Sequence, residues 1–196
     1  PEKLVTVERA DAARFTARIF TDEAIALGER VSLSFETRHI TLFDADGNTV
    51  LLTDQDRTKW SPRLIAEGLA LVDKAIRHRR PGPYQVQAAI AALHARARRA
   101  EDTDWAQIAL LYGALERMQP SPVVTLNRAV AVSKAEGPAA ALAMIGPLAR
   151  DLDRYFYFHG ARGAFLFELE RRNEAKIAFD RAIALANTSA EAAHIR

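Results

Sequence analysis

Apolar positions near the C-terminus of the chain recur at helical spacing. Ala175, Phe179 and Ala182 fall on one face of a predicted helix. The segment before it, 156–170, is predicted as a second helix, in which Gly163 marks a place where two helices can approach closely. Such a pair cannot bury its apolar faces alone, so we expect neighbouring helices.

Proline and glycine divide the rest of the chain from Ser61 onward into further helical segments. Ser61-Pro62 and Ser121-Pro122 are typical helix starts, and Pro81-Gly82-Pro83 is a firm stop. Gly137-Pro138 ends one segment and opens the next. The further predicted helices are 62–80, 84–99, 105–118, 123–135 and 139–152.

Small residues also recur at a fixed interval along the chain. In a frame that starts at Phe156, Gly163 is at position 8, Ala175 at position 20 and Phe179 at position 24. Moving the frame back by one such interval places Ala129 and Ala141 at positions 8 and 20. The interval and the small positions resemble a tetratricopeptide repeat, whose length is about 34 residues. We therefore predict an all-α fold, a tetratricopeptide-like helical-repeat array, or α-solenoid.

The N-terminal quarter gives a weaker pattern, and we place a domain boundary between 1–52 and 53–196. Segments 7–20 and 22–35 are predicted as amphipathic helices. The Asp46-Gly47 pair between two β-prone runs predicts a short β-hairpin near 40–52. The predicted repeat domain follows it.

Composition narrows the class of protein. The 196 residues are 49% hydrophobic and 27% charged, with a formal net charge of +2, which is too small to indicate nucleic-acid binding by itself. There is no cysteine, which excludes disulfides and agrees with a reducing, cytoplasmic location. No apolar run approaches the ~18 residues of a membrane span, and the first residues do not resemble a signal peptide.

Candidate catalytic groups are few. Asp54, Asp56, Arg57 and His94 could form a sensor or enzyme-like pocket if they converge with perturbed pKa values. No oxyanion hole, phosphate loop or second histidine at metal spacing accompanies them, so capping and ion pairing are the favoured interpretation. We expect no enzyme activity, no catalytic residues, no metal site and no cofactor.

Two arginine clusters give a second alternative, nucleic-acid binding. Residues 77–80 and Arg96, Arg98 and Arg99 each end a predicted helix, where cations are favoured by the helix dipole. Phosphate contact would require both clusters on one continuous face with aromatic residues between them. Helix-end placement is sufficient to explain them, so nucleic-acid binding is the weaker hypothesis.

Polar residues on otherwise alanine- and leucine-rich helices are the candidates for binding a partner. In a stack of helical pairs, the first helix of each pair lines a groove that can hold a peptide or a neighbouring domain. Solvent exposure explains each polar residue equally well. The groove candidates are Gln85, Gln87, His94, Asn127, Arg128, His159 and Arg162.

Longer motifs carry a more specific resemblance. They are DQDR (54–57), RRPGPYQ (79–85), AEDTDW (100–105) and SPVV-LNRAVAV (121–132). In this order they resemble the C-terminal tetratricopeptide-like extension of a family of extracytoplasmic-function (ECF) RNA polymerase sigma factors. The motif residues singled out are Asp54, Gln55, Asp56, Arg57, Asp102, Asp104 and Trp105.

The resemblance implies a regulatory protein-interaction domain that acts in transcription initiation. Its expected partners are sigma domains, the RNA polymerase core or another protein, and not a membrane. The two sigma domains that precede this extension in the family have no counterpart in the sequence, which indicates an excised or truncated C-terminal region. Homodimerisation through an exposed end of the stack is a further expectation.

Overall fold

A computed structural model describes residues 2–8, 14–20, 54–79, 81–186 and 192. The chain divides into two compact units, Pro1–Ile40 and Thr41–Arg196. The predicted helix at 22–35 and the predicted hairpin near 40–52 lie outside the described residues, as does the domain boundary near residue 52.

The described part of the first unit is a pair of strands. β1 (Glu2–Glu8) pairs antiparallel with β2 (Arg14–Phe20), with Glu2 opposite Phe20 and Val5 opposite Ala17. The helix predicted for 7–20 is therefore wrong. Phe15, Ala17 and Ile19 alternate with polar residues, a period of two that defines a strand and that the helical interpretation missed.

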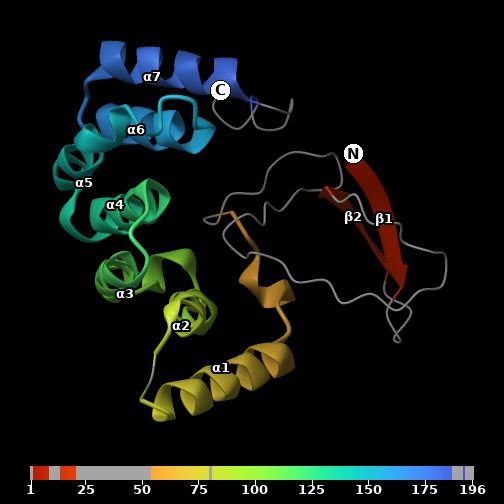
Figure 1. Cartoon of the computed structure of the whole chain (residues 1–196). Helices are drawn as coiled ribbons and strands as arrows, with labels where there is room; N and C mark the ends of the chain where they lie inside the picture. Colours follow the sequence, from red (N-terminus) through yellow and green to blue (C-terminus); the bar gives the residue numbers. More distant parts are fainter. Residues whose placement is uncertain (1, 9–13, 21–53, 80, 187–191, 193–196) are drawn as a thin grey trace. The chain divides into compact units, whose positions relative to one another are not determined.

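All regular structure described in the second unit is helical, and each helix packs against the next along the chain (Figure 1). The series is η2 (Arg57–Lys59), α1 (Pro62–Arg77), α2 (Pro83–Arg96), η3 (Ala100–Asp102), α3 (Trp105–Met118), α4 (Pro122–Glu136), α5 (Pro138–Ile145), η4 (Gly146–Ala149), α6 (Phe156–Glu168) and α7 (Arg172–Leu185).

Local signals explain where several helices begin and end. Ser61 Oγ accepts a hydrogen bond from Leu64 N (3.4 Å) and Pro62 is the first helical residue, as predicted. Gly137 separates α4 from α5 with a φ of 102°, which a residue with a side chain rarely adopts. After α1, Arg79 also has a positive φ, 51°.

The last two helical pairs are equally spaced along the chain. α4 begins at Pro122 and α6 at Phe156, while α5 begins at Pro138 and α7 at Arg172. The interval from α4 to α6 is therefore the same as the interval from α5 to α7. We call this equal spacing the repeat register.

The small residues that recur along these four helices lie in the core. Ala129, Ala141, Ala175 and Ala182 are all buried. Toward the N-terminus the spacing is less regular. α3 begins at Trp105, within one residue of the position that the repeat register predicts from α5, whereas α2 begins at Pro83, well before the position predicted from α4. The equal spacing of both helices of a pair therefore holds for the last four helices.

α6 and α7 approach each other closely at Gly163. A Cβ atom added to Gly163 would lie 2.4 Å from Cδ1 and Cε1 of the Phe179 ring. The missing side chain therefore lets the ring of α7 lie directly on the backbone of α6. This agrees with the prediction that Gly163 marks a close approach.

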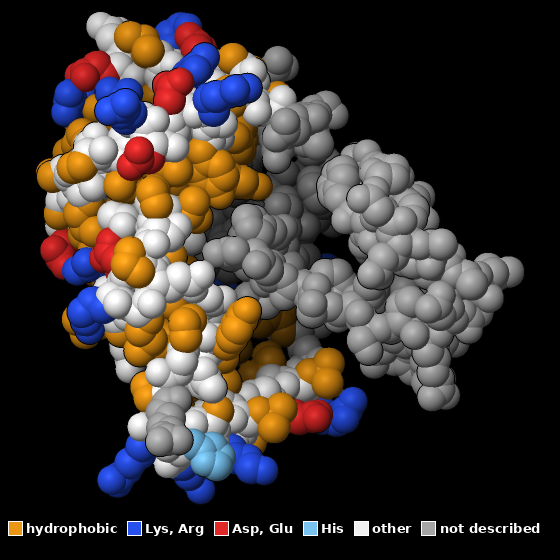
Figure 2. Space-filling model, viewed as in Figure 1, with side chains coloured by type: hydrophobic (Ala, Val, Ile, Leu, Met, Phe, Trp, Pro, Cys, Tyr) orange, Lys and Arg blue, Asp and Glu red, His pale blue; other side chains and the backbone are white. Residues whose placement is uncertain are grey.

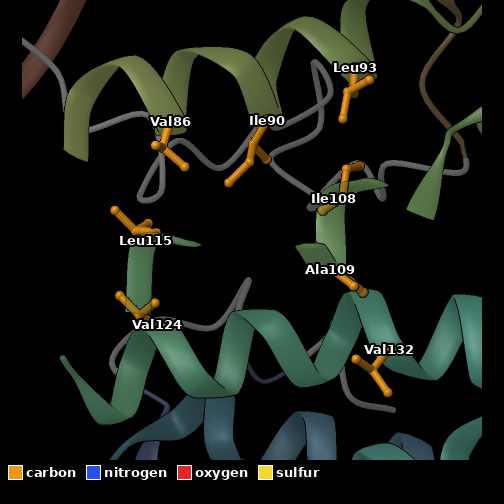
Figure 3. Close-up of a cluster of buried hydrophobic side chains, with 9 residues drawn as sticks. Val86, Ile90, Leu93, Ile108, Ala109, Leu115, Val124 and Val132 are labelled. Atoms are coloured by element: carbon orange, nitrogen blue, oxygen red, sulfur yellow. The ribbon is translucent and has the colours of Figure 1, made fainter. Parts of the chain in front are cut away.

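Clusters of buried apolar side chains lie between neighbouring helices from α2 to α7. Figure 3 shows Val86, Ile90 and Leu93 of α2 with side chains of α3 and α4, including Ile108 and Val124. A second cluster joins α4, α5 and α6 around Leu126, Ile145 and Phe158. α1 differs from these helices because none of its residues is buried.

Candidate functional site

Arg57 joins the segment before α1 to the end of α2. Asp56 first fixes the local backbone, since its Oδ1 accepts hydrogen bonds from Thr58 N (3.1 Å) and Thr58 Oγ1 (2.6 Å). Arg57 Nη1 then donates to the carbonyl oxygens of His94 (2.9 Å) and Ala97 (2.8 Å). These carbonyls are at the C-terminal end of α2, where backbone acceptors lack helical partners. The guanidinium therefore acts as a cap across 37 and 40 residues of sequence.

The rest of the Arg57 guanidinium is enclosed. Its Cζ lies 5.0 Å from the centre of the Trp60 ring, a cation–π contact. Arg57 Nε and Nη2 are buried and have no hydrogen-bond partner among the described residues. We call Arg57, Trp60, His94 and Trp105 the junction cluster.

His94 completes the junction cluster. Its ring lies edge-on to Trp105, with centroids 5.2 Å apart, and its Nδ1 is buried without a described hydrogen-bond partner. Burial, followed by the positive charge of Arg57, lowers the pKa of His94. Both causes favour the neutral form of the imidazole beside the arginine.

The AEDTDW motif follows this cluster and has structural contacts of its own. Asp104 Oδ1 caps α3 by accepting a hydrogen bond from Gln107 N (2.9 Å). Asp102 accepts two hydrogen bonds from Arg99, at 3.2 and 3.0 Å, which lower the pKa of Asp102. Trp105 is the first residue of α3. The DQDR and AEDTDW motifs thus meet at the junction cluster.

The four residues proposed for a sensor or enzyme-like pocket are brought together only in part. Arg57 and His94 are in one cluster, while Asp56 is exposed and bonds to its own 3-10 turn. Asp54 is exposed. Gln55 is half-buried. Within the described ranges, no three histidine, aspartate or glutamate side chains lie close enough to share a metal ion.

Arg128, a predicted groove residue, instead joins α3 to α4. Its Nη1 donates to Glu116 Oε2 (2.9 Å), and Thr125 Oγ1 donates to Glu116 Oε1. The Thr125 hydrogen bond, then that from Arg128, lowers the pKa of Glu116. Arg128 also lies over Gly113, where an added Cβ would be 3.4 Å from Arg128 Cζ. The positive charge of Arg128 is therefore paired with Glu116 inside the helical stack.

His159 and Gln85 also have internal partners. His159 is 6% exposed, and its Nε2 is 2.7 Å from the carbonyl oxygen of Asp153. The premise that it faces an open groove is wrong, because the imidazole is buried in α6. Gln85 Oε1 accepts from Gly82 N (3.0 Å) at the start of α2. Gln87, Asn127 and Arg162 are half-buried.

The two arginine clusters differ in charge balance. Arg96 pairs with Asp73 of α1 (3.2 Å), and Arg99 pairs with Asp102 (3.0 Å). Arg77, His78, Arg79 and Arg98 are exposed. Acidic partners therefore neutralise part of the second cluster, which weakens it as a phosphate-binding surface.

Sequence reasoning missed the large apolar side chains on the surface. Figure 2 shows hydrophobic side chains exposed between the charged residues of α7 and those of α1. On first helices of pairs, Tyr84 is 82% exposed, Tyr157 45% and Phe167 56%. Tyr84 and Tyr157 are each the second residue of a helix, so helical phase could have identified them. Further exposed residues are Leu64, Leu71, Ile76, Leu110, Met118 and Ile177.

Comparison with known proteins identifies a longer relative. A protein of Rhizobium meliloti (strain 1021), described as uncharacterized protein R00370, is 61% identical over 185 residues. The match covers 94% of this chain, which spans 44% of the relative's length. No protein family model matches the sequence. No solved structure matches it either. In the described part of the chain, no helix has both the length and the apolar character needed to cross a membrane.

Proposed function

We propose that the chain is a non-enzymatic protein-interaction domain of tetratricopeptide-like architecture. The observation that carries this proposal is the repeat register of α4 with α6 and of α5 with α7, together with the Gly163–Phe179 contact. Small residues at these positions are what a helical repeat needs for close pairing. Each pair leaves first-helix side chains available to a partner.

The binding surface of this domain is formed by the exposed aromatic residues of the first helices. Tyr84, Tyr157 and Phe167 project from α2 and α6 without being buried in the described stack. Aromatic side chains of this kind supply much of the free energy of protein–protein association. They replace the predicted polar residues Arg128 and His159, which have partners inside the stack.

The partner is proposed from the resemblance to ECF sigma factors. The DQDR and AEDTDW motifs, which carry that resemblance, share the junction cluster around Arg57. The 61% identical relative is more than twice as long as the matched region, which leaves room for further domains in that protein. We therefore expect the domain to dock sigma domains or core polymerase in the cytoplasm and so to control transcription initiation.

A binding titration of this chain against separately expressed sigma domains and core RNA polymerase tests the proposal. Tyr157→Ser and Phe167→Ser should weaken binding about tenfold or more while leaving the circular dichroism spectrum unchanged. Leu110→Ser is the matched control, since Leu110 is 74% exposed on α3, the second helix of its pair. Absence of binding to either partner by the folded wild-type protein would refute the transcription role.

The two alternative functions rest on fewer residues. A sensor pocket would use Arg57 and His94, because Arg57 Nε, Arg57 Nη2 and His94 Nδ1 are buried without a described hydrogen-bond partner. Binding of a small anion at these two residues is its test. Nucleic-acid binding would use the exposed Arg77, Arg79 and Arg98. It requires affinity that falls steeply with salt, and a flat response removes it.

A further inference from the structure

α1 is an amphipathic helix whose side chains the other described helices leave largely exposed. None of its sixteen residues is buried, while Leu64 is 51% exposed and Leu71 is 61% exposed. α2 covers only one edge of the helix, on the side where Asp73 pairs with Arg96. Leu64, Gly68 and Leu71 form an apolar edge that the described helices leave exposed, and the half-buried Ala75 continues it.

The open edge has the spacing of a helix-pairing seam. Leu64, Gly68, Leu71 and Ala75 follow one another at intervals of four, three and four residues, which places them in one stripe along α1. We call these four residues the α1 stripe. An added Cβ at Gly68 would meet no described atom within 4 Å. Glycine inside a helix is less favourable than alanine, and no described contact within the stack requires a glycine at this position.

In an antiparallel pair of α1 helices, the large residues of one α1 stripe can face the small residues of the other. If two copies of α1 pair antiparallel about the point midway between Gly68 and Leu71, each Leu71 faces the partner's Gly68. The same axis places each Leu64 opposite the partner's Ala75. Each large residue thus meets a small one, which permits close packing of two helices.

The charges beside the α1 stripe are also complementary under the same symmetry. Glu67 and Lys74 lie on its polar flank, and antiparallel pairing brings the Glu67 of one copy near the Lys74 of the other. Within one copy, Glu67 Oε2 lies 4.0 Å from Arg63 Nη1, which is the outer limit of an ion pair. A twofold interface needs such self-complementarity, because the same surface meets itself.

We propose that α1 forms an antiparallel homodimer contact through the α1 stripe, so that the occupant of this face is a second copy of the chain. The inference is independent of the proposed docking function, which uses α2 and α6. A single pair of sixteen-residue helices buries less than the roughly 1,200 Å² of a standard stable interface. The dimer is accordingly weak and concentration-dependent.

Sedimentation velocity of the full chain over a wide concentration range tests this inference. We expect a reversible monomer–dimer equilibrium that Leu71→Asp weakens about tenfold or more. Ile177→Asp is the matched control, because Ile177 is 67% exposed on α7 and should leave the equilibrium unchanged. A monomer at every concentration, or a dimer that Leu71→Asp does not weaken, would overturn the inference.

The Gly68→Met variant is expected to change the stability of the monomer and the affinity of the dimer in opposite directions. The new side chain has open space in the monomer and a better helix propensity, so dilute protein should melt at a higher temperature. In the dimer it would collide with the partner's Leu71 and lower the affinity. A variant that melts higher but dimerises as well as wild type would contradict the pairing.

Charge reversal tests the flank of the interface. Glu67→Lys and Lys74→Glu should each weaken the dimer, and the double variant should restore it. If the double variant dimerises no better than either single variant, the proposed register is wrong.

The direction of the helices can be fixed by cross-linking, because the chain has no cysteine. In the double variant L64C/A75C, antiparallel pairing places the two introduced thiols of different copies together, and mild oxidation should give a reducible dimer. The single variants L64C and A75C should stay monomeric on denaturing gels. Cross-linking of either single variant as efficiently as the double variant would refute the antiparallel arrangement.

Discussion

Two glycines inside helices, Gly163 of α6 and Gly68 of α1, have opposite surroundings. Gly163 is buried under the Phe179 ring, whereas Gly68 is exposed and has no described neighbour within 4 Å of an added Cβ. Both carry the same cost of a flexible residue in a helix. At Gly163 a contact within the stack offsets that cost, and at Gly68 no described contact does. α6 is therefore packed closely against α7, whereas α1 has an exposed side.

Substitution of Gly163 should have the largest effect on the free energy of unfolding. Gly163→Ala should lower the free energy of unfolding by about 2 kcal/mol, because the Cβ would overlap the Phe179 ring and force the two helices apart. Urea unfolding monitored by circular dichroism measures it. The double variant G163A/F179L should recover part of the loss, since the smaller side chain makes room. Equal or greater stability of G163A would show that the contact is not tight.

Removal of the Arg57 cap should have the next largest effect. Arg57→Ala deletes the hydrogen bonds to the His94 and Ala97 carbonyls and should cost about 1.5 kcal/mol in the free energy of unfolding. Thermal unfolding of Arg57→Ala and Arg57→Lys provides the check. Lysine keeps the charge but lacks the planar fork, so it should not restore the loss in full. Full restoration by lysine would indicate that only the charge matters.

A smaller, pH-dependent effect is expected at His94. Because its pKa in the folded protein is below the ordinary value of 6.5, the unfolded chain binds more protons between these two values. Stability should therefore fall as the pH drops from about 6.5 toward the folded pKa and then level off. His94→Gln should flatten this part of the curve relative to wild type. Identical slopes for both proteins would contradict burial of the imidazole.

The smallest effect is expected at the open glycine. Gly68→Ala should raise the free energy of unfolding by about 0.5–1 kcal/mol, since alanine favours the helix and the added methyl group has space. Urea unfolding of dilute protein, alongside Gly163→Ala, measures it. Destabilisation by Gly68→Ala would mean that this side of α1 is covered.

The helices of the second unit could be predicted because their signals are local. Ser61-Pro62 opens α1, and Gly137 separates α4 from α5, through contacts and dihedral preferences within a few residues. β1 and β2 were missed because short segments with apolar residues fit both a helical and a strand period when each is read alone. Local periodicity therefore identifies long helices more readily than short strands.

The contacts of the candidate site could not be predicted in the same way. Arg57 binds backbone carbonyls that lie 37 and 40 residues later, and no side-chain pattern marks a carbonyl as an acceptor. The polarity of His159 predicts a groove position, yet a buried imidazole is stable when a carbonyl such as that of Asp153 is within hydrogen-bond distance. Side-chain polarity alone does not indicate exposure.

Hydrogen–deuterium exchange of the native protein tests the contrast between α1 and the α6–α7 pair most directly. At low protein concentration, amides of α1 should exchange well before those of α6 and α7, because α1 buries no residue and α6 lies closed against α7. Arg57→Ala should accelerate α1 further without changing α6. Protection of α1 equal to that of α6 in dilute protein would contradict the account.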